Sequence, residues 1–262
     1  MRNFATFFSA VVLLIVPVLS NAGVVIDERE VVNLSHMITR DRTIMIEGNR
    51  QKSLSDNGKR TTIIDLDKGT MTVVDQTRKS YVVAPLPPKD SSKSLMPSGV
   101  PPIRLEKTGG HGLISGYSCD EYTGSGFVGQ NTVLIAGCFS ESAPGAADYD
   151  KFQSIMADKI KGSGMANPAR FPAGVPLTLS TTTTFGRLPA KMSPEQAARI
   201  ERILPRYQFV TSTTVTNITL TDLPMASFQV PPDYHRQQLP KLSGAASGKG
   251  PVHRPTIPKA PN

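Results

Sequence analysis

Between Val24 and Leu86, short runs rich in β-branched residues alternate with turn residues. The runs are VVIDE, TIMIEGN, TTIIDLD, TMTVVDQ and KSYVVAPL, and the breaks between them include Asp56-Asn57-Gly58 and Asp67-Lys68-Gly69. Aspartate, asparagine and glycine tolerate the positive φ angles of tight hairpins. Since strands that such short breaks join are antiparallel, the pattern predicts consecutive antiparallel strands.

The strand pattern returns after a proline- and serine-rich linker, PLPPKDSSKSLMPSGVPP, which no regular element would tolerate. The later strand-like runs are IRLEKTG, GLISGYSCDEYTGS, QNTVLIAGCFS, VPLTLSTTTTFGR, YQFVTSTTVTNITL and MASFQVPPDYH. Threonine-rich strands are typical of a half-exposed sheet. The whole chain therefore predicts at least nine strands, with helices packed on one side of them.

Two segments follow the helical period instead. In DYDKFQSIMADKIKG, apolar residues recur at helical spacing and Gly162 is placed to end the helix. In MSPEQAARIERILP, Ser193 is placed as the N-cap, Pro194 as the first helical residue and Gln196 as the partner in a capping box. The apolar stripe of this second helix consists of Ile200, Ile203 and Leu204. Helices of this kind pack on a core.

The first residues, MRNFATFFSAVVLLIVPVLSNAG, follow the order of a secretory signal peptide. The apolar run ends at Pro17 and is shorter than the roughly 20 apolar residues of a transmembrane helix. Small residues precede the bond between Ala22 and Gly23, so we expect cleavage there and residues 1–22 to be the signal peptide. The residue directly after this bond is glycine and not the cysteine that a lipid-anchored lipoprotein would use, so no lipid anchor is expected. We predict a soluble periplasmic protein.

The formal net charge of +8 is concentrated in a tail. Residues 236–262 carry five basic residues and no acidic one, and Arg2 belongs to the signal peptide, which leaves the body near +2. This distribution argues against nucleic-acid binding by the protein as a whole. Residues 238–262 lack the apolar content to fold, so we expect a disordered, basic, proline-rich tail.

The chain has two cysteines, Cys119 and Cys138. In an exported protein two thiols persist as a disulfide. The alternative is zinc or nucleophilic chemistry, but no nearby histidine completes a tetrahedral site. We therefore predict a Cys119–Cys138 disulfide. If it joins directly opposed residues of a hairpin, the turn lies between Val128 and Gly129, where glycine suits the loop.

Catalytic motifs are absent from the sequence. It contains no Gly-x-Ser-x-Gly, no His-Glu-x-x-His, no phosphate-binding glycine loop and no Cys-x-x-Cys. His111 stands in a glycine cluster and fits a turn better than a catalytic loop. Asp65 and Asp67, beside Asp75, would suit either a calcium site or turn capping, and capping fits better. The sequence predicts no catalytic residue, metal ion or cofactor, and it identifies no ligand-binding residue.

The order of segments resembles a bacterial exported family of unknown function, which is similar in fold to the LolA/LolB-like lipoprotein-localisation carriers. The segments that carry the resemblance are IEGNRQKSLSDNGKRTTIIDLDKGTMTVVDQTRKSYVVAPL, KTGGHGLISGYSCDEYT, VPLTLSTTTTF and FQVPPDY. The resemblance implies a mainly β domain over residues 23–237. Its fold would be a curved antiparallel sheet, or incomplete β-barrel, of about nine to eleven strands with two amphipathic helices on the concave side.

In the carriers the concave side holds acyl chains. The resemblance therefore implies a non-catalytic binding or carrier protein for an apolar, lipid-like ligand. The alternative is an envelope scaffold with a filled core, whose basic tail contacts anionic envelope components; an enzyme with an unfamiliar site is the third hypothesis. The helix from Ser193 to Leu204 is then a candidate lid, because its apolar stripe is short and weakly packed elements open at low free-energy cost.

Overall fold

The structure is a computed structural model, and it describes residues 22–33, 37–87, 102–128, 131–161, 163, 169–185, 195 and 208–238. Twelve of the 14 strands in this part of the chain form one sheet, in the order β14-β6-β5-β4-β3-β2-β1-β13-β12-β10-β9-β8. Its strands are β1 (Gly23–Asn33), β2 (Met37–Glu47), β3 (Arg50–Ser55), β4 (Arg60–Asp65), β5 (Thr70–Asp75), β6 (Ser80–Pro85), β8 (Glu106–Ile114), β9 (Tyr117–Val128), β10 (Asn131–Ser140), β12 (Val175–Thr184), β13 (Gln208–Thr221) and β14 (His235–Arg236).

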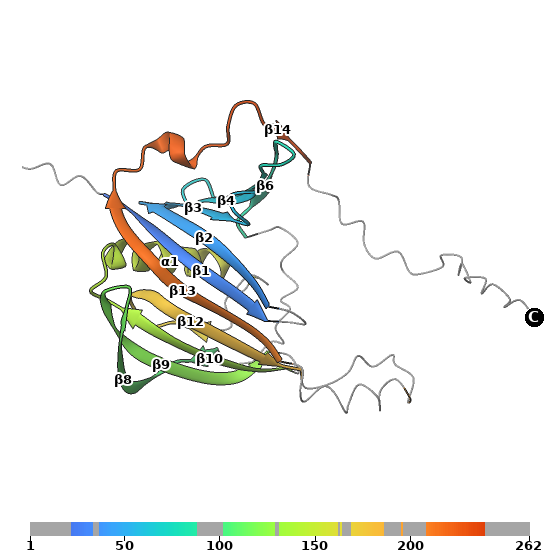
Figure 1. Ribbon diagram of the computed structural model, residues 1–262. Coiled ribbons are helices and arrows are strands. Elements are labelled where there is room, and N and C mark those ends of the chain that lie inside the picture. Colours follow the sequence, from blue (N-terminus) through green and yellow to red (C-terminus); the bar gives the residue numbers. More distant parts are fainter. Residues whose placement is uncertain are drawn as a thin grey trace, which may run out of the picture.

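Strands β1 to β6 pair in succession as antiparallel neighbours, as their turn residues predict. Strand β13 returns from the second half of the chain and pairs antiparallel with β1, which joins both halves into one surface (Figure 1). Strand β14 pairs with β6 in parallel. The two end strands, β8 and β14, do not pair with each other, so the sheet is not closed into a barrel.

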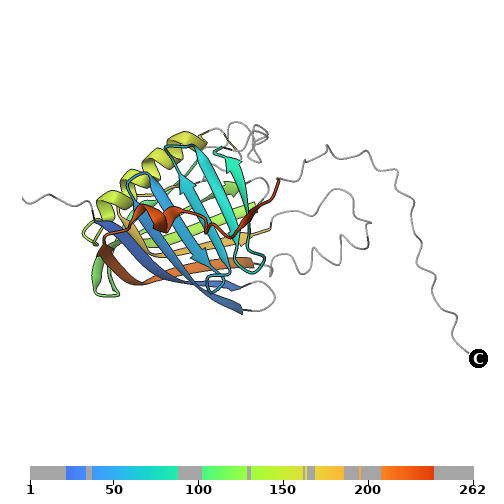
Figure 2. The same cartoon turned by 90° about the horizontal axis from the view of Figure 1, so that it is seen from above.

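The sheet curves around helix α1 (Ala146–Ile160), which lies against its inner face (Figure 1, Figure 2). Phe152 of α1 is a large, fully buried side chain of the main core, at 1% exposure. It belongs to one cluster with apolar residues from both halves of the sheet, including Val24, Ile46, Leu177 and Val215. The prediction of a mainly β fold with a curved antiparallel sheet is confirmed.

A second, smaller cluster lies farther along the same face. Strands β7 (Ile103–Arg104) and β11 (Ala169–Arg170) pair in parallel, and they pack with Val133 and Ile135 of β10. Glycines in β9 make room for this layer: a Cβ on Gly124 would collide with the carbonyl oxygen of Arg104. The glycines of the segment TGSGF therefore have a packing role.

The outer face of β2 to β6 is crossed by the segment that follows β13. In this segment, a 3-10 helix (Met225–Phe228) places Phe228 over Ile63 and Val74. The Lys52 ammonium donates to the Ser227 carbonyl at 2.9 Å, and the Tyr234 hydroxyl donates to the Gln76 side chain. This segment thus covers part of the outer face of this half of the sheet.

The structure corrects several details of the prediction. The described residues form 14 strands where nine to eleven were expected, partly because β7, β11 and β14 are only two residues long. The segment MASF was predicted as a strand and is a 3-10 helix. The described residues include one α-helix with defined bounds where two helices were predicted. Apart from Glu195, the second helix lies outside the described residues.

Candidate functional site

Burial of the inner face falls off along β1. Val24 and Ile26 are 0% exposed and Glu28 is 5% exposed, whereas Glu30 and Val32, which follow on the same face, are only half-buried. Helix α1 has 15 residues, so it is about 22 Å long. Strand β1 alone spans about 36 Å, and the helix cannot cover the whole concave surface.

The half-buried region continues across the neighbouring strands. Val32 lies opposite Thr211, Thr211 lies opposite Thr181, and Thr183 lies opposite Phe209. The strand register places these residues side by side on the inner face of the sheet. We call this surface the open inner face, and it consists of Glu30, Val32, Thr181, Thr183, Phe209 and Thr211. All six are half-buried. This surface is mixed: Val32 and Phe209 are apolar, the three threonines carry both methyl and hydroxyl groups, and Glu30 is acidic.

A partly buried ion pair lies between the filled core and the open inner face. Arg42 donates from Nε and from its terminal nitrogen to Glu28 Oε2, at 2.9 and 2.6 Å. Burial raises the pKa of Glu28 above its ordinary value, and the neighbouring Arg42 partly opposes this shift. Burial, followed by the charge of Glu28, also raises the pKa of Tyr149 on α1. This arrangement places a charged pair at the edge of an apolar core.

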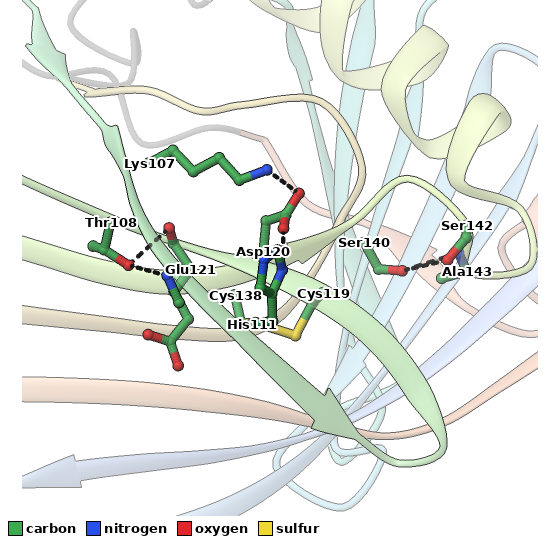
Figure 3. Close-up of a disulfide and its surroundings, with 11 residues drawn as sticks. Lys107, Thr108, His111, Cys119, Asp120, Glu121, Cys138, Ser140, Ser142 and Ala143 are labelled. Atoms are coloured by element: carbon green, nitrogen blue, oxygen red, sulfur yellow. Dashed lines mark hydrogen bonds and ion pairs between the residues drawn. A yellow bond between two sulfur atoms is a disulfide. The ribbon is translucent and has the colours of Figure 1, made fainter.

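The two cysteines form the predicted disulfide, with Cα atoms 5.4 Å apart (Figure 3). The predicted register is wrong, because Cys138 lies opposite Glu121 and not opposite Cys119. The bond joins diagonal neighbours on β9 and β10. The disulfide packs against Gly112 of β8: a Cβ atom at this position would lie only 3.1 Å from Cys138 Sγ, which is a crowded contact. The bond therefore sits where β8, β9 and β10 meet.

Asp120 lies between Lys107 and His111 beside the disulfide (Figure 3). Its carboxylate contacts Lys107 Nζ and His111 Nδ1, both at 2.7 Å. The hydrogen bond from Lys107 holds the pKa of Asp120 below its ordinary value. His111 is 73% exposed and lies on the edge strand β8, so it is part of a strand and not of the predicted turn. Charged side chains on an edge strand hinder pairing with another sheet.

A shallow groove of about 360 Å³ crosses the same half of the sheet on another surface. In its lining, the register aligns Thr123, Ala136, Ser180 and Ser212 in one row. This row faces away from the clusters, because it alternates with the buried Ile135. The lining is rich in hydroxyl groups and includes Glu121. It does not provide the apolar interior that a lipid carrier requires.

The remaining predicted residues divide into three groups. Gly23 is the first residue of β1, and Ala22 directly precedes the strand. Asp65 accepts a hydrogen bond from the backbone N–H of Lys68 at 2.9 Å, which confirms turn capping there, and Asp75 accepts one from the backbone N–H of Arg78 at 3.0 Å. Asp67 instead accepts a hydrogen bond from the Asn49 side-chain amide at 2.7 Å. The candidate lid residues Ser193, Pro194, Gln196, Ile200, Ile203 and Leu204 lie outside the described residues, as do residues 239–262 of the tail.

Two observations concern the described part of the chain alone. It contains no group of three or more histidine, cysteine, aspartate and glutamate side chains that could hold a metal ion. Within the same ranges, no helix has the length and apolar character needed to cross a membrane.

The sequence analysis did not predict the Glu28–Arg42 ion pair. The sequence does contain a sign of this pair, because the charged Glu28 follows Val24 and Ile26 at every second position, where an inward-facing apolar residue is expected. The partner of Glu28, however, can be identified only from the strand register.

No protein-family model and no curated protein matches the chain. Among solved structures it is similar to PNGF-II, at 10% identity and a TM-score of 0.39 over 83% of this chain, but the match spans only 32% of PNGF-II. It is also similar to a LolA superfamily protein from Nitrosomonas europaea, at 9% identity and a TM-score of 0.29, covering 80% of this chain and 90% of that one. A domain from Vibrio parahaemolyticus assigned to outer membrane lipoprotein sorting gives 10% identity and a TM-score of 0.31, covering 80% and 91%.

These superpositions are partial, and any functional conclusion rests on the residues of this chain.

Proposed function

We propose that the protein is a non-catalytic periplasmic binding or carrier protein for an apolar, lipid-like ligand, which it holds on the open inner face. The observation that carries this proposal is the change in burial along β1, from 0% exposure at Ile26 to half-burial at Val32. A curved sheet that is only partly filled by its helix leaves a concave surface for a ligand.

The apolar groups of the open inner face support an acyl chain as the ligand, and the acidic Glu30 lies at the end nearest to Glu28. Val32, Phe209 and the methyl groups of Thr181, Thr183 and Thr211 offer apolar contact along neighbouring strands. An acyl chain that loses contact with water on such a surface gains about 0.8 kcal/mol for each buried methylene group. The Glu28–Arg42 pair at the inner end provides charged groups near a ligand head group.

The alternative, an envelope scaffold, is favoured by a different observation. Around Phe152 the concave side is filled by buried side chains from α1, β1, β2, β12 and β13. If such packing extends along the whole concavity, no ligand fits. In that reading the function lies in contacts of the surface and of the basic tail with anionic envelope components.

A titration with a fluorescent fatty acid tests the proposal. Neighbouring threonines of β12 provide a matched pair: Thr181 is on the open inner face, whereas Thr182 lies opposite the exposed Leu134 on the other face. Thr181→Trp should fill the inner face and weaken saturable binding at least about tenfold, equivalent to 1.4 kcal/mol. Thr182→Trp should leave it unchanged. Equal effects of both variants, or no saturable binding by the parent protein, would reject the carrier proposal.

A further inference from the structure

The N-terminal end of β1 is packed against an acidic side chain. Gly23 is the first residue of the strand, is buried and lies opposite Thr221 of β13. On its other side, the pairing of Val24 with Ile46 brings it beside Glu47 of β2. A Cβ on Gly23 would collide with Glu47 Oε2. The carboxylate therefore lies directly over the Gly23 backbone, which only glycine permits.

This carboxylate has an unsatisfied oxygen. Glu47 Oε2 is buried and accepts no hydrogen bond from any described residue. Burial raises the pKa of Glu47, and the nearby carboxylates of Asp148 and Asp222 raise it further. Leaving a buried acceptor without a partner costs about 1–3 kcal/mol, and more for a charged group. A cation that is small enough to fit beside the Gly23 backbone would provide a partner for Glu47 Oε2.

We propose that the missing cation is the α-ammonium group of Gly23 itself, which hydrolysis of the Ala22–Gly23 bond creates. Water adds across the peptide bond, the carboxylate of Ala22 leaves with the signal peptide, and the amine of Gly23 takes up a proton. The resulting ammonium is one bond, about 1.46 Å, from the Cα atom over which Glu47 lies. It forms an ion pair with Glu47, and Asp148 and Asp222 add to the favourable field.

The site links export to stability. Before cleavage the nitrogen of Gly23 is a neutral amide, and the acidic cluster of Glu47, Asp148 and Asp222 lacks this cation. After cleavage, an α-amino group with an ordinary pKa of about 7.7–8.0 is mostly protonated at neutral pH. The mature protein is then held at β1 by an interaction that its precursor does not have. This inference does not depend on the ligand proposal.

A double-mutant cycle tests the ion pair. Protein that begins at Gly23 is compared with the same protein acetylated at its N-terminus, each with and without Glu47→Gln. In the free form, Glu47→Gln should lower the melting temperature by about 4 °C or more, the shift expected from losing a buried charged hydrogen bond in a domain of this size. In the acetylated form it should cause no loss. The matched control is Glu30→Gln, which lies on β1 like Gly23 but is remote from it. This change should shift the melting temperature by the same amount in the free and the acetylated protein.

Two further readouts keep the proposal open to refutation. The pKa of the α-amino group, measured by NMR titration, should lie at least about one unit above its ordinary value. Intact mass of the secreted protein should place its N-terminus at Gly23. Equal loss of stability from Glu47→Gln in free and acetylated protein, an unshifted α-amino pKa, or a mature N-terminus at another residue would each overturn the ion pair.

Discussion

Replacing Arg42 by methionine should destabilise the protein more than any comparable change at a surface arginine. Arg42 makes two hydrogen bonds to Glu28 Oε2, at 2.9 and 2.6 Å. The Glu28 side chain is 6% exposed, so without Arg42 its charge is left in an apolar setting at the edge of the core. Methionine has a similar length and conserves the packing of the arginine stem.

The expected loss follows from the burial of each partner. Breaking a buried ion pair costs about 3–5 kcal/mol because an uncompensated charge remains. The Arg42 side chain is 36% exposed, so solvent screens part of the interaction and the lower value, about 3 kcal/mol, applies. For a domain of this size that corresponds to a fall in melting temperature of about 6–12 °C.

The loss should also depend on pH. Burial already raises the pKa of Glu28 in the folded protein, and removal of Arg42 raises it further because Arg42 lowers it. Above the ordinary pKa of about 4.3, the unfolded chain releases this proton before the folded one, so stability falls as pH rises. The difference between Arg42→Met and the parent should therefore be larger at pH 7 than at pH 4.5.

Urea unfolding followed by circular dichroism at both pH values measures these differences. Arg40→Met is the matched control, because Arg40 forms a more exposed pair with Asp56 at 3.3 Å and should contribute no more than about 1 kcal/mol. A loss below about 1 kcal/mol for Arg42→Met, or the same loss at both pH values, would refute the reasoning.

Three further changes have defined outcomes. Replacing both Cys119 and Cys138 by alanine should cost about 3 kcal/mol in urea unfolding, because the bond closes a loop with a sequence separation of 19, and an unchanged midpoint would contradict this. Gly124→Ala should cost about 1–3 kcal/mol by pushing β7 from the sheet, whereas Ser125→Ala on the opposite face should stay within about 0.5 kcal/mol; equal effects would refute the packing role. Deleting residues 238–262 should leave the melting temperature within a few degrees and weaken salt-sensitive binding to anionic vesicles, since each lysine contributes about 1 kcal/mol there; unchanged vesicle binding would remove the tail's proposed role.

Local signals in the sequence suffice for much of the sheet. β-Branched residues favour the strand conformation, and turn residues mark where a strand ends; both signals depend on only a few neighbouring residues. These signals identify β1, β2, β4, β5 and β6. Strand β3 was missed, because its sequence RQKSLS is polar and its Lys52 is held by the Ser227 carbonyl, 175 residues away. The turn at Ser115-Gly116, with φ of 51° and 86°, was read as part of one strand although Ser-Gly is a turn signal.

Long-range contacts explain the other differences. The disulfide partners followed from the presence of two cysteines in a chain that we predict to be exported, but their diagonal placement depends on the register of β9 and β10. The segment MASF forms a 3-10 helix because Phe228 packs over Ile63 and Val74, which lie far from it in the sequence. The partner of Glu28, and the position of Glu47 beside Gly23, likewise become visible only when β1 and β2 are aligned.

Native mass spectrometry of the protein purified from a Gram-negative periplasm tests the central proposal most directly. If the open inner face holds an apolar ligand, part of the protein should carry an added mass, and organic extraction should release a lipid that accounts for it. Thr181→Trp protein, prepared in parallel, should lose this mass, whereas Thr182→Trp protein should keep it. A parent protein with only its own mass, under conditions that preserve a known lipid carrier's ligand, would contradict the carrier proposal and favour the scaffold.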